Sequence, residues 1–134
     1  MEQKEETMIA FYQLLGRVFY AAAQADGVIR DEEVAMLKTI VKDVWLDFED
    51  ALDTFGTDAG YQIEIVFDHL LKNDGSIVNI ISEVKDFKKI HSSIFSKKVV
   101  ELIMSTSYRI VSSFAKRNKS ELVFLSQLRA VLEK

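Results

Sequence analysis

The 134-residue chain contains no proline and only five glycines, and this scarcity of helix breakers constrains its fold more than any other feature. Proline ends or kinks a helix, and glycine weakens a helix interior relative to alanine. A chain without the first and with little of the second can form long, uninterrupted helices. We therefore expect a protein built mainly from α-helices.

Apolar residues recur at the helical spacing along most of the chain. The first repeat predicts a helix from about residue 4 to Ala25. Further sets with this spacing are Val34, Leu37, Ile40, Val41 and Val44; Ile77, Ile80, Ile81, Val84 and Phe87; Val99, Leu102, Ile103, Ile110 and Phe114; and Leu122, Leu125, Leu128 and Leu132. Turns are expected at Gly56, at Gly60 and in the NDGS of residues 73–76.

One segment, YQIEIVF at residues 61–67, alternates like a strand. Its apolar residues Ile63, Val66 and Phe67 also share one helical face with Leu70. A lone strand would have no partner to pair with, so we expect a helix here as well. The sequence thus predicts an all-α, single-domain bundle of about six or seven helices over residues 1–134.

Composition removes several classes of protein. The absence of cysteine excludes disulfides, thiolate metal sites and a cysteine nucleophile. The charged start, MEQKEET, is unlike a signal peptide, and Gln13 and Arg17 interrupt the apolar stretch that follows. We expect a cytoplasmic protein without membrane insertion.

The net charge of −4 conceals a division along the chain. Residues 1–84 carry six Lys and Arg against seventeen Asp and Glu, and residues 85–134 carry eleven against four. Such asymmetry can mark a surface for a charged partner. The simpler interpretation, which we favour, is that the two parts attract each other within the folded domain.

The stretch AAAQADGVIRDEE, residues 21–33, matches the second half of an EF-hand loop. With Asp26 at loop position five, Gly27 falls on position six, Ile29 on eight and Glu33 on twelve. Positions one and three are then Ala22 and Gln24, where carboxylates or amides are expected. The same residues also suit a plain turn, in which Gly27 bends the chain and acidic residues open the next helix.

The longer segment AQADGVIRDEEVAMLKTI, residues 23–40, resembles the first signature of the TerB-like family, which is named after tellurite-resistance operons. The resemblance implies an all-helical fold and a stress or tellurite-resistance setting. Family members usually carry a second related signature, which here corresponds to residues 112–128. Alignment of Glu33 with Glu121 matches Leu37 to Leu125, but the basic KRNK of residues 116–119 replaces the second acidic loop.

The ligand count limits any metal site to a weak one. Asp26 and Glu33 offer carboxylates, and Glu121 could add another if the two signatures pack as pseudo-symmetric partners. Ca²⁺ takes six to eight oxygens and Mg²⁺ six, so water would fill much of the shell. The sequence permits a weakly bound Ca²⁺ or Mg²⁺ and predicts no other cofactor. A second candidate, NDGSIVNII, fails because its twelfth position would be Ile81.

No catalytic constellation is present in the sequence. His69 and His91 lack metal-ligand spacing, and no nucleophile or phosphate-binding motif occurs. We expect His69 to be a partly buried helix residue and His91 to lie on the surface. The protein is not predicted to be an enzyme.

Two functions of different classes follow from the sequence. The first is a non-catalytic TerB-like module that binds another protein, and the second is weak divalent-cation binding by the Asp26 loop. A third, nucleic-acid binding, would use the basic residues Lys85, Lys88, Lys89, Lys97 and Lys98. Only Phe87 and Phe95 interleave with these lysines, both suit a helix core, and the acidic total opposes this third function.

Overall fold

The protein was examined as a computed structural model that describes residues 2–25, 27–46, 59–73, 75, 77, 79–113 and 119–133. Within them lie six α-helices and no strand. The helices are α1 (Glu2–Gln24), α2 (Asp31–Ile40), α4 (Gln62–Lys72), α5 (Ile80–Ile90), α6 (Lys97–Ser112) and α7 (Lys119–Leu132). Three short elements accompany them: the π-helix η1 (Val41–Trp45) and the 3₁₀ turns η2 (Ala59–Tyr61) and η3 (Ser92–Ile94). The predicted all-α bundle is confirmed.

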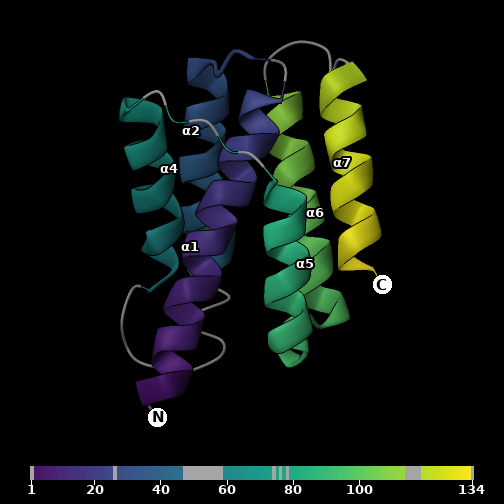
Figure 1. The fold of residues 1–134 in the computed structure, drawn as a ribbon. Coiled ribbons are helices and arrows are strands. Elements are labelled where there is room, and N and C mark those ends of the chain that lie inside the picture. The colour runs from purple at the N-terminus through teal and green to yellow at the C-terminus, as the bar shows by residue number, and fades with distance from the viewer. Residues whose placement is uncertain are drawn as a thin grey trace.

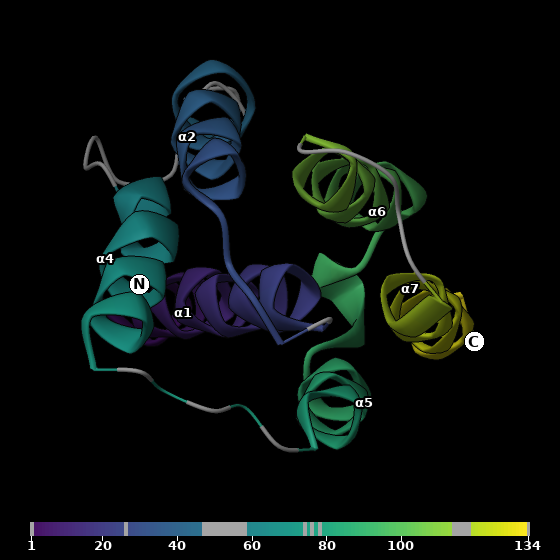
Figure 2. The ribbon, with the colours of Figure 1, turned by 90° about the horizontal axis from the view of Figure 1, so that it is seen from above.

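The first helix forms the centre of the bundle (Figure 1). It packs against α4, α5, α6 and α7. Seen from above, α2 and α4 lie on one side of α1, and α5, α6 and α7 lie on the other (Figure 2). The charge division of the sequence therefore has a spatial counterpart, because most of the basic second part folds into the second group of helices.

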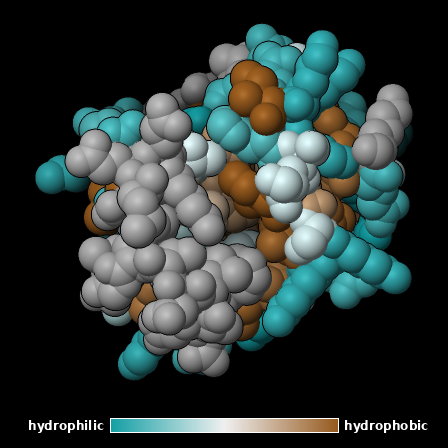
Figure 3. All heavy atoms as spheres, turned by 90° about the horizontal axis from the view of Figure 1, so that it is seen from below, coloured by the Kyte–Doolittle hydropathy of each residue, from teal (hydrophilic) through white to brown (hydrophobic). Residues whose placement is uncertain are grey.

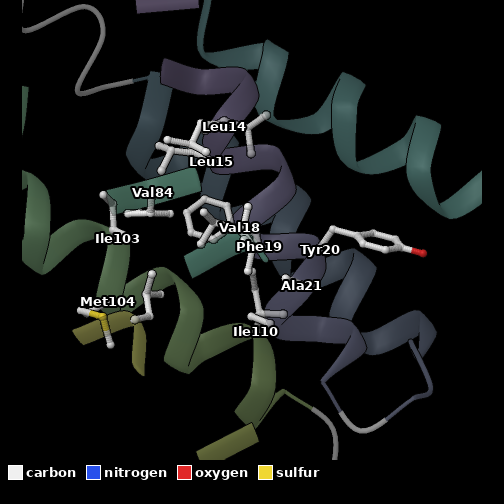
Figure 4. Close-up of a cluster of buried hydrophobic side chains, with 14 of the residues drawn as sticks. Leu14, Leu15, Val18, Phe19, Tyr20, Ala21, Val84, Ile103, Met104 and Ile110 are labelled. Atoms are coloured by element: carbon white, nitrogen blue, oxygen red, sulfur yellow. The ribbon is translucent and has the colours of Figure 1, made fainter. Parts of the chain in front are cut away.

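The core consists mainly of large apolar side chains of α1 and the helices around it. Phe11, Tyr12, Leu15 and Phe19 are fully buried on α1. Figure 4 shows side chains of α1 gathered with those of α5 and α6, whereas Tyr20 points away from this cluster. The Tyr20 hydroxyl instead donates a hydrogen bond to the Gly75 carbonyl oxygen at 2.8 Å. The sequence of α1 is dense in apolar residues, as expected for a central helix that is buried on several sides.

The ambiguous segment 61–67 is helical, as predicted. Ile63 and Phe67 are 0 % exposed, whereas Ile65 between them is 56 % exposed. A strand would have placed these three side chains on one face, so the exposures exclude the alternating pattern. Gly16 lets α4 approach α1 closely, because a Cβ at this position would lie 2.8 Å from the Ile63 carbonyl oxygen.

The second predicted helix differs from expectation at its end. The α-helix ends at Ile40, and residues 41–45 continue as a π-helix. This wider turn leaves both Val41 and Trp45 buried, and the Trp45 indole Nε1–H donates to Thr106 Oγ1 at 3.0 Å. Short π segments interrupt α-helices where a local hydrogen-bond shift is stabilised by the surroundings. Here the buried Trp45–Thr106 bond ties the segment to α6.

Two of the predicted turns fall on described residues. After α4, the Gly75 N–H donates to the Leu70 carbonyl oxygen at 2.7 Å, which closes the end of the helix, while Asp74 and Ser76 lie outside the described residues. Gly60 lies in the 3₁₀ turn η2, as predicted, and Gly56 and Phe114 lie outside the described residues. In the described part of the chain, no helix has the length and apolar character needed to cross a membrane.

Candidate functional site

The loop after α1 has the turn geometry that its sequence predicts. Gly27 has a φ of +91°, in the region that favours glycine, and its N–H donates to the Gln24 carbonyl oxygen at 2.7 Å. Ile29 packs against the core, as expected. Asp26 lies outside the described residues. The described part of the loop is therefore a tight connection between α1 and α2.

Glu33 supports the start of α2. Its side chain is 0 % exposed, and its Oε1 accepts a hydrogen bond from the Arg30 backbone N–H at 2.9 Å. This contact is one half of a capping box, in which an acidic residue in the first turn satisfies a backbone donor ahead of the helix. Asp31 and Glu32 in the same turn are exposed. Glu33 thus differs from its acidic neighbours in being a buried structural carboxylate.

Glu121 occupies the same place in α7 as Glu33 does in α2. Each is the third residue of its helix, and Glu121 is only 2 % exposed. Both helices begin at the upper end of the bundle, next to the C-terminus of α1 (Figure 1). The alignment of the two signatures therefore matches two buried carboxylates at one end of the molecule.

The predicted metal set is only partly described. No group of three or more His, Asp or Glu side chains that could hold a metal exists among the described residues, and Asp26 is not one of them. Gln24, which falls on position three of the EF-hand alignment, donates its Nε2–H to the Gly75 carbonyl oxygen at 2.8 Å. The set Asp26, Glu33 and Glu121 stays a prediction.

A surface groove lies between α5 and α7, on the side of α1 opposite to α2 and α4. These two helices pack side by side and run in the same direction (Figures 1 and 2). A groove of about 610 Å³ opens between them. It is lined by Ile81, Lys85, Lys88, Lys89, Ser92, Gln127, Ala130 and Val131. Its size falls in the usual range for ligand sites in proteins, roughly 300–1,000 Å³.

A second hollow of about 310 Å³ continues this groove toward the upper end. Gln127 lines both hollows, so they adjoin along α7. The upper part is lined by Ala21, Gln24, Ala25, Ile77, Ile80, Ser120, Val123, Phe124 and Gln127. From Ser120 to Val131 the lining of α7 spans twelve residues, whose eleven steps along the axis correspond to about 16 Å of helix. We call the two parts together the α5/α7 groove.

The lower part of the α5/α7 groove is basic. Lys85 and Lys89 are exposed one helical turn apart, and no carboxylate occurs among the described residues that line either part. The Lys88 ammonium donates to the carbonyl oxygens of Val131, at 3.3 Å, and Leu132. A cation at this place stabilises the end of α7, where unpaired carbonyls carry partial negative charge. Lys88 thus joins the two helices, and Lys85 and Lys89 frame the opening.

The aromatic residues among the lysines belong to the core. Phe95 is buried, and Phe87 stacks against Phe11 with ring centroids 6.2 Å apart. Both rings are in contact with other aromatic rings of the core, which opposes a role as a stacking platform for nucleic-acid bases. His91 is half-buried with its ring 4.6 Å from that of Phe87, and His69 is exposed. The prediction that His69 is partly buried is therefore wrong, because burial depends on neighbouring helices and not on local sequence, whereas His91 keeps part of its surface exposed.

The molecular surface agrees with a mixed apolar and charged lower end. Seen from below, apolar atoms are visible between hydrophilic side chains that extend outward (Figure 3). Ile90 in the last turn of α5 is the most exposed large apolar side chain described, at 75 %. Apolar surface framed by polar groups is typical of binding sites.

The α5/α7 groove was not predicted from the sequence, although three of its lysines, Lys85, Lys88 and Lys89, stood out as basic residues. One local signal was available. Ile81, Lys85, Lys88 and Ser92 are spaced by four, three and four residues, so they form one continuous face of α5. Its two lysines make this face too polar for the core, and Ile81 at its start is an apolar residue that favours burial. A helix face of this mixed kind indicates the wall of a groove.

Comparison of the chain with protein-family models, with curated proteins and with solved structures finds no match. The resemblance to the TerB-like family accordingly rests on residues 23–40 and their partial repeat at residues 112–128. The function has to be argued from the site.

Proposed function

We propose that the protein is a non-catalytic, TerB-like helical module of the cytoplasm that acts by binding another protein. The observation that carries this proposal is the α5/α7 groove. The groove is about 16 Å long and combines an apolar lining with exposed lysines at one end. The stress or tellurite-resistance setting is part of the proposal and rests on the sequence resemblance alone.

The shape of the groove favours a macromolecular partner over a compact small molecule. Its two parts form an elongated groove along α5 and α7, to which the end of α1 adds lining in the upper part, and not an enclosed cavity. Grooves of this kind bind an amphipathic segment, whose apolar residues pack against the lining while its polar residues contact the rim. No nucleophile or acid–base group is required for such binding.

Site-specific photo-crosslinking in the source cells tests this function. A benzophenone amino acid is placed at Gln127, which lines both parts of the groove, and in a control at Ala35, which is exposed on α2. We expect one discrete protein adduct from position 127 and none from position 35. Ala130→Arg, which fills the groove at an exposed position, should remove the adduct. Equal adducts from both positions, or none from 127, would contradict the proposal.

The second candidate function is weak divalent-cation binding. The observation that favours it is the burial of Glu33 and Glu121 in matching helix starts at one end of the bundle. Carboxylate oxygens are suitable ligands for Ca²⁺ and Mg²⁺, and a site with Asp26 would hold the ion mainly through these groups and water. Because Glu33 also caps α2, ion binding and helix capping would share one carboxylate.

Calorimetric titration with Ca²⁺, Mg²⁺, Mn²⁺ and Zn²⁺ tests the second candidate. We expect a dissociation constant of roughly 10⁻⁴ M or weaker, as in low-affinity calcium modules. The variant Asp26→Asn, Glu33→Gln should abolish binding, whereas Asp31→Asn, Glu32→Gln removes two exposed charges from the same turn and should not. An ion bound in the sub-micromolar range and unaffected by the first variant would place the site elsewhere.

A further inference from the structure

We infer that the occupant of the α5/α7 groove is an amphipathic helix with an acidic N-terminal turn, lying antiparallel to α5 and α7. This inference rests on the proposed function and specifies the chemistry of the partner. Four properties of the groove carry it: length, lining, distribution of charge, and direction of the two helices that form its walls.

Length and lining indicate a helix. The α5/α7 groove is about 16 Å long, which is the length of about three turns of α-helix. A bound helix of this length would place its apolar residues at positions i, i+4 and i+7 over the apolar groups of the walls, among them Ile80, Ile81 and Val123. A fatty acid would also suit an apolar lining with a cationic rim, and its binding is one outcome of the test below.

The charge is confined to one end of the groove. Lys85, Lys88 and Lys89 line the lower part, whereas the described residues of the upper part are apolar or neutral. Of the three lysines, Lys88 is engaged with the carbonyls of α7, and Lys85 and Lys89 are exposed at the rim. A complementary partner therefore carries its acidic residues at the end that meets these two lysines.

The direction of α5 and α7 determines which end of the partner this is. Both helices have their C-termini at the lower end, so their partial negative charges lie there together (Figure 1). A partner helix that runs antiparallel to them brings its positive N-terminal dipole to this end. Acidic residues are favourable in the first turn of any helix, and here the same residues would face Lys85 and Lys89. The antiparallel orientation thus satisfies both electrostatic requirements at once.

The test uses three synthetic 12-residue peptides, which match the length of the groove as helices, with one apolar stripe and equal composition apart from charge. The first carries three glutamates in its first turn, the second carries them in its last turn, and the third has glutamines in their place. Fluorescence anisotropy measures affinity, and ¹⁵N–¹H correlation spectra locate binding through shifts of residues such as Gln127 and Ala130. We expect the first peptide to bind about tenfold more tightly than the other two, which corresponds to about 1.4 kcal/mol and lies within the range for two exposed ion pairs together.

Charge reversal in the protein provides the matched control. Lys85→Glu, Lys89→Glu should weaken the first peptide about tenfold, and a peptide with lysines in its first turn should recover the loss. Lys42→Glu, Lys72→Glu makes the same change in net charge at exposed positions on the α2 and α4 side and should leave binding unchanged. Thermal melts of both variants verify that the fold is retained.

The outcomes separate this inference from the function on which it rests. Equal affinity of the three peptides, or retention of binding by Lys85→Glu, Lys89→Glu, overturns the acidic, antiparallel helix. Groove shifts caused by decanoate but by none of the peptides overturn it in favour of a lipid-like ligand. Absence of any photo-crosslinked adduct from position 127 in the otherwise unchanged protein is a separate result, and it overturns the protein-binding function itself.

Discussion

The two helix pairs α1–α2 and α6–α7 have similar core positions but different connections. Glu33 and Glu121 are both buried, and the leucines that follow them by four residues, Leu37 and Leu125, are also buried. The first connection, residues 25–30, carries one Asp and one Arg and turns at Gly27, whereas the second, residues 113–118, carries the two basic residues Lys116 and Arg117 and no acidic one. The comparison indicates that the side chains facing the core are retained in both pairs while the loop charge differs. The predictions below test this division.

The largest effect is expected in the core. Leu37→Ala and Leu125→Ala each remove a fully buried side chain and leave a cavity, at a cost of about 2–5 kcal/mol in unfolding free energy. Urea denaturation measures both. If the two pairs contribute equally to one cooperative core, both losses fall in this range and the transitions stay two-state. A loss below about 1 kcal/mol at Leu125 would show that the second pair is only loosely attached.

The second largest effect on stability is expected for the buried carboxylates Glu33 and Glu121. Glu33→Ala removes the acceptor of the Arg30 N–H and should cost about 1–3 kcal/mol, because a backbone donor at the helix start loses its partner. Glu33→Gln keeps an oxygen acceptor and should cost less than Glu33→Ala. Glu32→Ala, at an exposed position of the same turn, is the control and should be close to neutral.

The same substitutions at Glu121 sharpen the comparison. Thermal and urea unfolding of Glu121→Ala and Glu121→Gln should give the same order of stability as at position 33. A Glu121→Ala protein as stable as the parent would mean that the two carboxylates share only their position in the sequence.

The sequence was sufficient for the fold but not for the site. Helical periodicity located the helices because each buries one face in a common core, as Ile63 and Phe67 do in α4. The π-helix was not predictable, since the shift of hydrogen bonds after Ile40 depends on how Trp45 meets Thr106 across the core. Local spacing cannot express a contact between segments 61 residues apart.

The candidate sites show the same limit. The placement of Glu33 at a helix start followed from the turn at Gly27, and its burial is a tertiary property. The α5/α7 groove depends on the parallel packing of two helices separated in the chain by α6. The sequence therefore showed that Lys85 and Lys89 are basic, but it did not show the apolar lining beside them on which their proposed binding role depends.

Gly27 offers a smaller and cleaner test of the first connection. Its φ of +91° is strained for any other residue, yet a Cβ there would meet nothing within 4 Å. Gly27→Val should therefore lose about 1–3 kcal/mol through backbone strain and not through a clash. Gly27→Ala, with the same conformational restriction and a smaller side chain, should lose at least half as much in thermal melts. No loss in either variant would mean that the turn adopts another geometry in solution.

Salt should have the smallest effect, and it tests whether the acidic and basic parts of the chain stabilise each other. Ion pairs among the described residues include Arg17–Glu83 at 2.9 Å and Lys38–Asp68 at 3.6 Å, which lie within residues 1–84, and Arg129–Glu133 at 2.8 Å, which lies within residues 85–134. All are partly exposed, so screening by sodium chloride should reduce the unfolding free energy by less than about 1 kcal/mol. None of these three pairs joins the two parts, so Arg17→Gln should leave unchanged any salt dependence that arises between them. A stability that rises steadily with salt would contradict attraction between the two parts, and it would show instead that each repels itself, as expected of surfaces that bind partners of opposite charge.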